Sequence, residues 1–133
     1  MSVTGSLVLG LGARAGVSEE ELAAAIDAAL RQAGLGPARI NALATLDRRA
    51  AEVGIRAVAQ RYGWPITGFA AAALADVDVP HGSGIVAEAT GTPSVAEAAA
   101  LLAAGPDAVL VLPKTVFPRS TVAIARGSND PHT

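Results

Sequence analysis

Apolar segments of two kinds alternate along the chain, separated by glycine, proline and polar residues. Short apolar runs predict strands, and apolar residues that recur at helical spacing predict helices. The predicted strands are residues 3–9, 39–46, 66–69, 108–112 and 121–125, and the predicted helices are residues 18–33, 47–62 and 94–104, with a helical turn at 70–75. The order strand–helix–strand–helix–strand, followed by helix–strand–strand, is typical of an α/β fold.

We therefore expect one α/β domain over residues 1–126, a three-layer sandwich with a mostly parallel sheet of about five strands. The connection between the last two predicted strands is too short for a helical crossover, so we expect one antiparallel strand. Residues 127–133 are mostly polar and are expected to form a flexible tail.

The least regular part of the chain is residues 76–91, which contain Pro80 and three glycines. A short strand is expected inside this segment at 85–89. Long irregular segments in compact domains are often functional, so this segment is a candidate lid or partner surface.

Serine and aspartate residues mark the expected helix starts. Ser18 and Glu21 form a capping box, in which the serine oxygen accepts a backbone N–H and the glutamate reaches back. Ser94 and Glu97 form a second capping box, and Asp47 is expected to cap the middle helix.

A glycine-rich segment follows the first predicted strand. Gly10, Gly12 and Gly16, with Arg14 among them, are expected to form a loop that leads into the helix at Ser18. Glycine lets the backbone approach a ligand closely, and a helix start offers N–H groups and a partial positive charge. Arg14 adds a fork-shaped donor for a carboxylate or phosphate. The segment predicts an anion site, although a tight strand-to-helix turn without a ligand fits it equally well.

Further polar residues are expected at the same edge of the sheet, because ligands of open α/β sheets bind beyond the carboxyl ends of the strands. They are Thr45 and Asp47 after the second strand, Thr92 and Ser94 before the third helix, and Lys114 past the fourth strand. Together with the glycine loop, they predict a site for an acidic ligand. Taken singly, Asp47 and Ser94 are explained as helix caps, and Lys114 as a solvated charge.

Composition excludes several functional classes. The net charge is -2, only 3% of residues are aromatic and no basic run occurs, which argues against a nucleic-acid partner. The absence of cysteine excludes disulfides, zinc–thiolate sites and thiol nucleophiles, and fits a cytoplasmic location. His81 and His132 are the only histidines, so no metal or cofactor is expected. We see no secretion signal and no apolar stretch of ~18 residues, and therefore expect no membrane segment.

Six segments in a fixed order cover nearly the whole chain from Val3 to Arg126. They are residues 10–16 (GLGARAG), 43–52 (LATLDRRAAE) followed by Gly54, 79–83 (VPHGS), 91–100 (GTPSVAEAAA), 112–114 (LPK) and 121–126 (TVAIAR). Each segment alone is weakly specific. Together they resemble the cobalamin-biosynthesis family that contains CobE and the C-terminal domain of CbiG.

The chain departs from the pattern of this family at three points. Ala13 precedes Arg14 where the family often has cysteine, so no chemistry here can depend on that thiol. Arg49 stands in place of a family lysine and keeps the charge but not a titratable amine. Residues 80–83 read PHGS where the family has proline-asparagine-proline-serine, so His81 replaces the asparagine.

The resemblance implies a role in building the corrin ring, with a carboxylate-rich precorrin as the ligand. Fused CbiG opens a lactone on a cobalt-precorrin and releases a two-carbon unit, and we expect that hydrolysis to belong mainly to regions missing here. The residues expected to bind the ligand are Gly10, Gly12, Arg14, Gly16, Thr45, Asp47, Ser83, Thr92, Ser94 and Lys114. No catalytic residue is assigned, and a homo-oligomer stays open.

Two other functional classes stay open. The glycine spacing also suggests a nucleotide-binding α/β protein with Asp47 on a ribose hydroxyl, but the spacing is off by one and the acid comes later than the expected ~20 residues. The other class is a non-catalytic module that docks on other cobalamin-biosynthesis enzymes and uses residues 76–91 as its partner surface.

Overall fold

A five-stranded sheet forms the centre of the molecule. The computed structural model describes residues 6–77, 94–105 and 107–127. The strands are β1 (Leu7–Ala13), β2 (Ala42–Leu46), β3 (Ile66–Phe69), β4 (Val109–Phe117) and β5 (Ser120–Arg126), and their order in the sheet is β3-β2-β1-β5-β4. Pairing is parallel from β1 to β2 and from β2 to β3, whereas β5 is antiparallel to both β1 and β4. Four strands therefore run in one direction and one runs against them, which confirms the predicted mostly parallel sheet.

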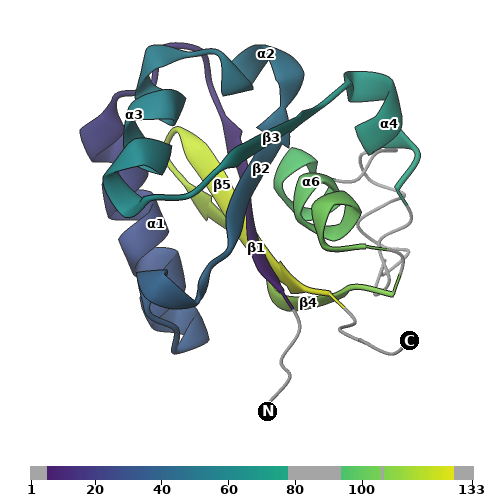
Figure 1. Cartoon of the computed structure of the whole chain (residues 1–133). Helices are drawn as coiled ribbons and strands as arrows, with labels where there is room; N and C mark the ends of the chain where they lie inside the picture. The colour runs from purple at the N-terminus through teal and green to yellow at the C-terminus, as the bar shows by residue number, and fades with distance from the viewer. Residues whose placement is uncertain (1–5, 78–93, 106, 128–133) are drawn as a thin grey trace.

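Helices cover both faces of this sheet (Figure 1). They are α1 (Glu19–Ala33), α2 (Asp47–Ala50), α3 (Val53–Tyr62), α4 (Ala71–Ala75) and α6 (Val95–Ala104), with a 3₁₀ turn at Pro37–Arg39. α1 and α3 lie on one face, and α6 and α4 lie on the other (Figure 1). The predicted three-layer α/β sandwich is thus confirmed. Among the helices of the described residues, none is long and apolar enough to cross a membrane.

The two faces of the sheet are packed by different kinds of side chain. Leu9 and Leu11 of β1 belong to a core of large residues with α1 and α3. On the other face, α6 contributes small side chains such as Ala98 and Ala99. A Cβ at Gly10 would collide with the carbonyl oxygen of Ala96 and lie 2.9 Å from the Ala100 Cβ. Gly10 therefore lets α6 lie directly on the sheet.

β1 is longer at its carboxyl end than predicted. Gly10 and Gly12 were expected in a loop, but they lie inside the strand, with Gly10 opposite Ala44 of β2 and Gly12 opposite Thr121 of β5. The loop begins only at Arg14. Gly10 is compatible with a strand here because α6 packs closely above it, so its lack of a side chain serves packing, whereas a Cβ at Gly12 would make only an ordinary contact.

The predicted helix at 47–62 is divided into α2 and α3 by a break at Ala51 and Glu52. Asp47 is the first residue of α2, and the helix has no side-chain cap, so the predicted capping role of Asp47 is wrong. The break turns the Glu52 carboxylate toward Gly16, whose backbone N–H donates to it over 3.0 Å.

The two predicted capping boxes differ in the structure. Ser18 and Glu21 form the complete box at the start of α1. Ser94 caps α6 by accepting the Glu97 N–H, but the Glu97 carboxylate accepts the backbone N–H of Lys114 over 2.9 Å. The second box is therefore half formed, because β4 offers Glu97 a different donor.

The carboxyl-terminal strands are also longer than predicted. β4 continues through Phe117 to a tight turn at Pro118 and Arg119, so Lys114 lies within the strand and not past its end. Gly127 was expected in the tail, but it is buried and its N–H donates to the Ser6 carbonyl over 2.8 Å. The rest of the predicted tail, 128–133, and the predicted strand at 85–89 lie outside the described residues.

Candidate functional site

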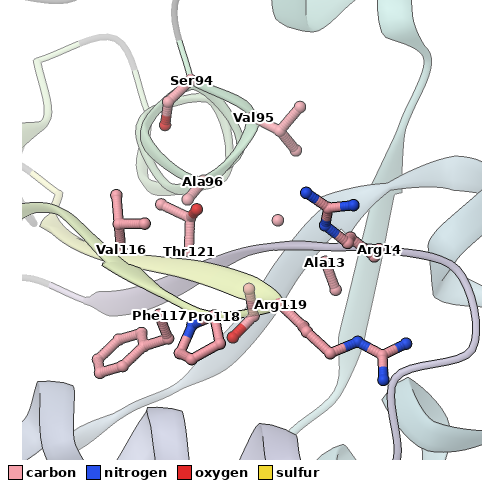
Figure 2. A pocket seen from close by; sticks show the side chains of 12 residues that line it. Ala13, Arg14, Ser94, Val95, Ala96, Val116, Phe117, Pro118, Arg119 and Thr121 are labelled. Atoms are coloured by element: carbon pink, nitrogen blue, oxygen red, sulfur yellow. The ribbon is translucent and has the colours of Figure 1, made fainter.

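A hollow of about 450 Å³ lies at the carboxyl end of β1, between the first turn of α6 and the turn that joins β4 to β5 (Figure 2). Its lining consists of Gly12, Ala13, Arg14, Ser94, Val95, Ala96, Val116, Phe117, Pro118, Arg119, Ser120 and Thr121. It contains two arginines and no acidic side chain from the described part of the chain. The hollow is thus a cationic site at the edge where the sequence predicts one.

Apolar side chains make up much of the wall of this hollow. Val95 comes from α6, and Val116, Phe117 and Pro118 come from the end of β4 and its turn. Val116 is 70% exposed. An exposed apolar surface next to cationic groups suits a ligand with an apolar body and acidic substituents.

The two arginines of the hollow are held differently. The Arg14 backbone N–H donates to the Arg119 carbonyl over 3.1 Å, which fixes the two residues side by side. Figure 2 shows their guanidinium groups extending in opposite directions, Arg14 toward Val95 and Arg119 away from it. Arg119 lies 3.6 Å from a carboxylate oxygen of Glu21 on α1. Arg14 is therefore the cation that is directed toward α6 and the apolar wall.

The start of α6 forms the opposite side of the hollow. Gly12 faces it, and a Cβ at Gly12 would lie 3.5 Å from the Val95 Cβ, which is an ordinary contact. The expected anion site at the start of α1 is different, because α1 carries Glu19, Glu20 and Glu21 in its first turn. The helix start that borders the hollow is thus that of α6 and not that of α1.

The structure brings three of the predicted ligand-binding residues together at this hollow, namely Gly12, Arg14 and Ser94. Gly10 lies beneath α6, and Thr45 is fully buried with its hydroxyl donating to the Leu11 carbonyl over 2.7 Å. The remaining predicted residues in the described ranges are Gly16 in the loop before α1, Asp47 at the start of α2 and Lys114, exposed, within β4. Ser83 and Thr92 lie outside the described residues. Gly10 and Gly12 lie within β1 and not in a loop. The nucleotide-binding alternative, which required a glycine loop there, is therefore not supported.

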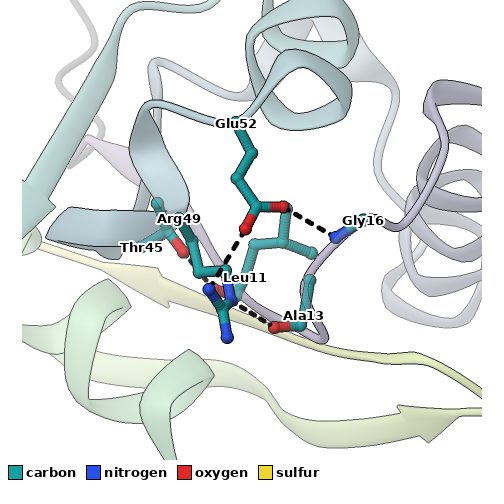
Figure 3. A network of polar contacts seen from close by, with 6 residues as sticks. All are labelled: Leu11, Ala13, Gly16, Thr45, Arg49 and Glu52. Atoms are coloured by element: carbon teal, nitrogen blue, oxygen red, sulfur yellow. Dashed lines mark hydrogen bonds and ion pairs between the residues drawn. The ribbon is translucent and has the colours of Figure 1, made fainter.

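Arg49 and Glu52 hold the loop that carries Arg14 (Figure 3). The Arg49 Nε donates to the Ala13 carbonyl over 2.9 Å, and a second nitrogen of Arg49 lies 3.1 Å from Glu52 Oε2. The other oxygen of Glu52 accepts the Gly16 N–H. Arg49 and Glu52 were not among the residues expected at the site. The replacement of a family lysine by Arg49 was the available signal, but the helix predicted over both residues hid their arrangement.

A buried acid connects the other two sides of the hollow. Glu97 is 5% exposed, and its carboxylate binds the Lys114 backbone N–H. Lys114 lies at an irregularity of β4, because β4 advances from Leu112 to Thr115 while β5 advances only from Ile124 to Val122. The extra residue on β4 is a bulge, and Glu97 satisfies the N–H that the bulge turns away from β5.

A second hollow, of about 590 Å³, lies between the loop before α1 and the start of α3. Glu19 and Glu52 line it, together with Val53, which is 83% exposed. Its acidic lining suits an anionic ligand less well than the hollow beside Arg14. Within the described residues, no cluster of three or more His, Cys, Asp or Glu side chains could hold a metal ion.

Tyr62 and Trp64 line neither of the two hollows. The Tyr62 hydroxyl donates to Asp27 of α1 over 2.6 Å, and its ring stacks on Trp64 with centroids 4.6 Å apart. Burial, and then the hydrogen bond to Asp27, raise the pKa of Tyr62 to about 12. The phenol therefore stays neutral and joins α3 to α1.

The model of the family described as cobalamin synthesis G C-terminus matches residues 7–125. The chain belongs to this family. The match begins in β1 and ends in β5, so it contains the whole sheet apart from the last residue of β5. The resemblance drawn from the sequence is confirmed.

Members and relatives of the family agree with the fold and place the chain in cobalamin biosynthesis. CobE from Sinorhizobium sp is 41% identical over 121 residues, which cover 90% of this chain and 79% of that protein. A crystal structure of CobE from the cobalamin (vitamin B12) biosynthetic pathway matches with a TM-score of 0.77 and 33% identity, covering 97% of this chain and 95% of that chain. The cobalt-precorrin-5A hydrolase of Priestia megaterium is 29% identical over 119 residues, which cover 90% of this chain but only 32% of that protein. The chain is a cobalamin-biosynthesis protein of the CobE and CbiG type.

Proposed function

We propose that the protein binds a carboxylate-rich precorrin intermediate in the hollow beside Arg14 and assists its conversion. The residues that line the hollow are the main support for this proposal. Arg14 and the start of α6 meet an apolar wall there, and no described acidic side chain lines it. The family membership indicates the biosynthetic pathway, and the lining of the hollow indicates a ligand with acidic groups and an apolar body.

Precorrins combine a largely apolar macrocycle with acetate and propionate groups around its rim. The apolar side chains of Val95 and Val116 offer a surface for the macrocycle on the α6 side of the sheet. Arg14 offers paired N–H donors to a peripheral carboxylate, and the α6 dipole favours a negative charge at the same place. Both parts of the ligand thus have a matching part of the hollow.

Lys114 is the second cation of this proposal. It is exposed on β4, outside the lining of the hollow, and the Glu97 contact fixes its backbone. β4 contributes both Lys114 and the exposed wall residue Val116. A ligand that extends from the hollow along β4 therefore meets Lys114 with another of its carboxylates.

The hydrolysis of fused relatives is not assigned to this chain. The Priestia megaterium relative is a cobalt-precorrin-5A hydrolase, and this chain matches about a third of its length. We assign to the matched part the binding and presentation of the intermediate, and to the rest of such proteins the hydrolytic step. The presented intermediate would pass to other enzymes of the pathway.

Absorbance titration with two corrins tests the proposal, because the chromophore reports its own binding. Cobyrinic acid carries free peripheral carboxyl groups, whereas amides replace those groups in cobinamide. We expect the protein to bind cobyrinic acid and to discriminate against cobinamide. A charged hydrogen bond contributes roughly 1.5–3 kcal/mol, so Arg14→Ala should weaken binding of cobyrinic acid about ten- to a hundredfold.

Arg56→Ala is the matched control, because Arg56 is an exposed arginine of α3 that does not line the hollow. It should change the affinity little. Equal binding of the two corrins, or equal losses in Arg14→Ala and Arg56→Ala, would contradict carboxylate recognition by Arg14. If wild-type protein binds neither corrin, the docking module becomes the better hypothesis, and co-purification with tagged precorrin-modifying enzymes tests it.

A further inference from the structure

The break between α2 and α3 places Arg49 and Glu52 at the base of the loop that carries Arg14. We propose that these two residues, the Arg49–Glu52 clamp, are positioning residues that aim Arg14 at the acidic ligand. The inference rests on the proposed function, since it concerns the same site. It assigns the clamp a part in recognition without any contact to the ligand.

The clamp holds both ends of the loop with one ion pair (Figure 3). At one end, Arg49 Nε binds the Ala13 carbonyl over 2.9 Å, and at the other end Glu52 Oε1 binds the Gly16 N–H over 3.0 Å. The side chains of Arg49 and Glu52 are each only 24% exposed, and they lie 3.1 Å apart. Partial burial reduces the screening of this pair by water, so it holds the loop more firmly than a surface pair would.

A purely helical role does not explain the placement of Glu52. It is the residue before α3, where its side chain could cap the helix, yet α3 has no side-chain cap. The carboxylate reaches instead to Gly16, which has a positive φ of 80°. Two residues further on, a Cβ at Gly54 would collide with the Val17 carbonyl. The start of α3 is therefore built against the loop, and Glu52 is directed to the loop backbone.

The sign of the change in ligand affinity distinguishes a positioning role of Glu52 from a purely electrostatic effect of its charge. Glu52→Ala removes a negative charge, which by long-range electrostatics alone should strengthen binding of an anion. Loss of the clamp should weaken it, because Arg14 would sample many orientations before it meets a carboxylate. A weaker affinity after removal of an acid is thus the result that a positioning role predicts.

The experiment measures cobyrinic acid affinity and the hydrogen exchange of the Gly16 amide in the full chain. We expect Glu52→Ala to accelerate Gly16 exchange in the ligand-free protein and to weaken binding about three- to tenfold. The double variant Arg14→Ala/Glu52→Ala should bind no more weakly than Arg14→Ala alone, because the clamp acts only through Arg14. Glu52→Gln keeps an oxygen for the Gly16 N–H and should lie between wild type and Glu52→Ala.

Glu20→Ala is the control for charge, because Glu20 is an exposed acid in the first turn of α1. It should bind as tightly as wild type or slightly more tightly. Unchanged or tighter binding by Glu52→Ala, or losses that simply add in the double variant, would overturn the clamp while the proposed function stands. Absence of cobyrinic acid binding by wild type would overturn both, and Gly16 exchange would then show only whether the clamp orders the loop.

Discussion

At the scale of single residues, the glycines of β1 have different neighbours. Gly10 lies beneath α6, where the Ala96 carbonyl occupies the place of a side chain. Gly12 lies two residues nearer the end of the strand, where α6 starts and the hollow opens. The two glycines therefore have separable roles in packing and in shaping the site.

Substitution of these glycines by alanine should show the difference. Gly10→Ala forces α6 away from the sheet, and such overpacking typically destabilises by about 1–3 kcal/mol. Gly12→Ala makes only an ordinary contact with Val95, and reduced freedom of the unfolded chain offsets part of any loss, so its effect should stay within about 1 kcal/mol. Urea unfolding of both variants measures the free energies. Equal destabilisation by the two substitutions would contradict the packing described for α6.

The sequence predicted some residue roles because their partners are close along the chain. The Ser18 capping box depends on residues three positions apart and is present in full. Glu97 has the same spacing from Ser94, but its carboxylate accepts the backbone N–H of Lys114, which is distant in sequence. Arg49 and Glu52 likewise bind backbone groups that lie 36 residues away. Partners of this kind depend on tertiary packing, which a local pattern does not specify.

At the scale of elements, the order of strands and helices followed from the hydrophobic pattern, whereas their ends did not. β1 and β4 extend beyond their predicted ends at Leu9 and Leu112 because neighbouring strands continue to pair with them. A glycine follows the predicted end of β1 and Pro113 follows that of β4, and both residue types are unfavourable inside a strand. In the structure, α6 covers the glycines and a bulge accommodates the proline. The hollow depends on these extensions, since Gly12, Val116 and Phe117 all lie in them.

The contact between Glu97 and the bulge of β4 joins a helix to an edge strand. Glu97→Ala leaves the Lys114 N–H without its acceptor, which should destabilise the fold by about 1–3 kcal/mol. Glu97→Gln keeps an oxygen acceptor and avoids a buried charge, so it should stay within about 1 kcal/mol of wild type. Urea unfolding compares the two variants with wild type. Equal losses would mean that the negative charge, and not the hydrogen bond, matters at this position.

At the scale of the whole molecule, the site lies where three layers meet at the end of the sheet. The α6 layer supplies the helix start, the sheet supplies the apolar wall, and the loop to the opposite layer supplies Arg14. The edge of the sheet was predictable from the parallel topology, because the loops after parallel strands gather there. Which helix start borders the hollow was not predictable, since β5 inserts between β1 and β4 only in the folded sheet.

A titration of ¹⁵N-labelled protein with cobyrinic acid tests directly whether an acidic corrin binds in the hollow beside Arg14. We expect saturable shifts of the Gly12, Arg14, Val95 and Thr121 amides, which surround the hollow. The Val53 and Gly54 amides at the second hollow serve as internal controls and should not move. Shifts centred on Val53 and Gly54, or no saturable shift at any amide, would contradict the claim.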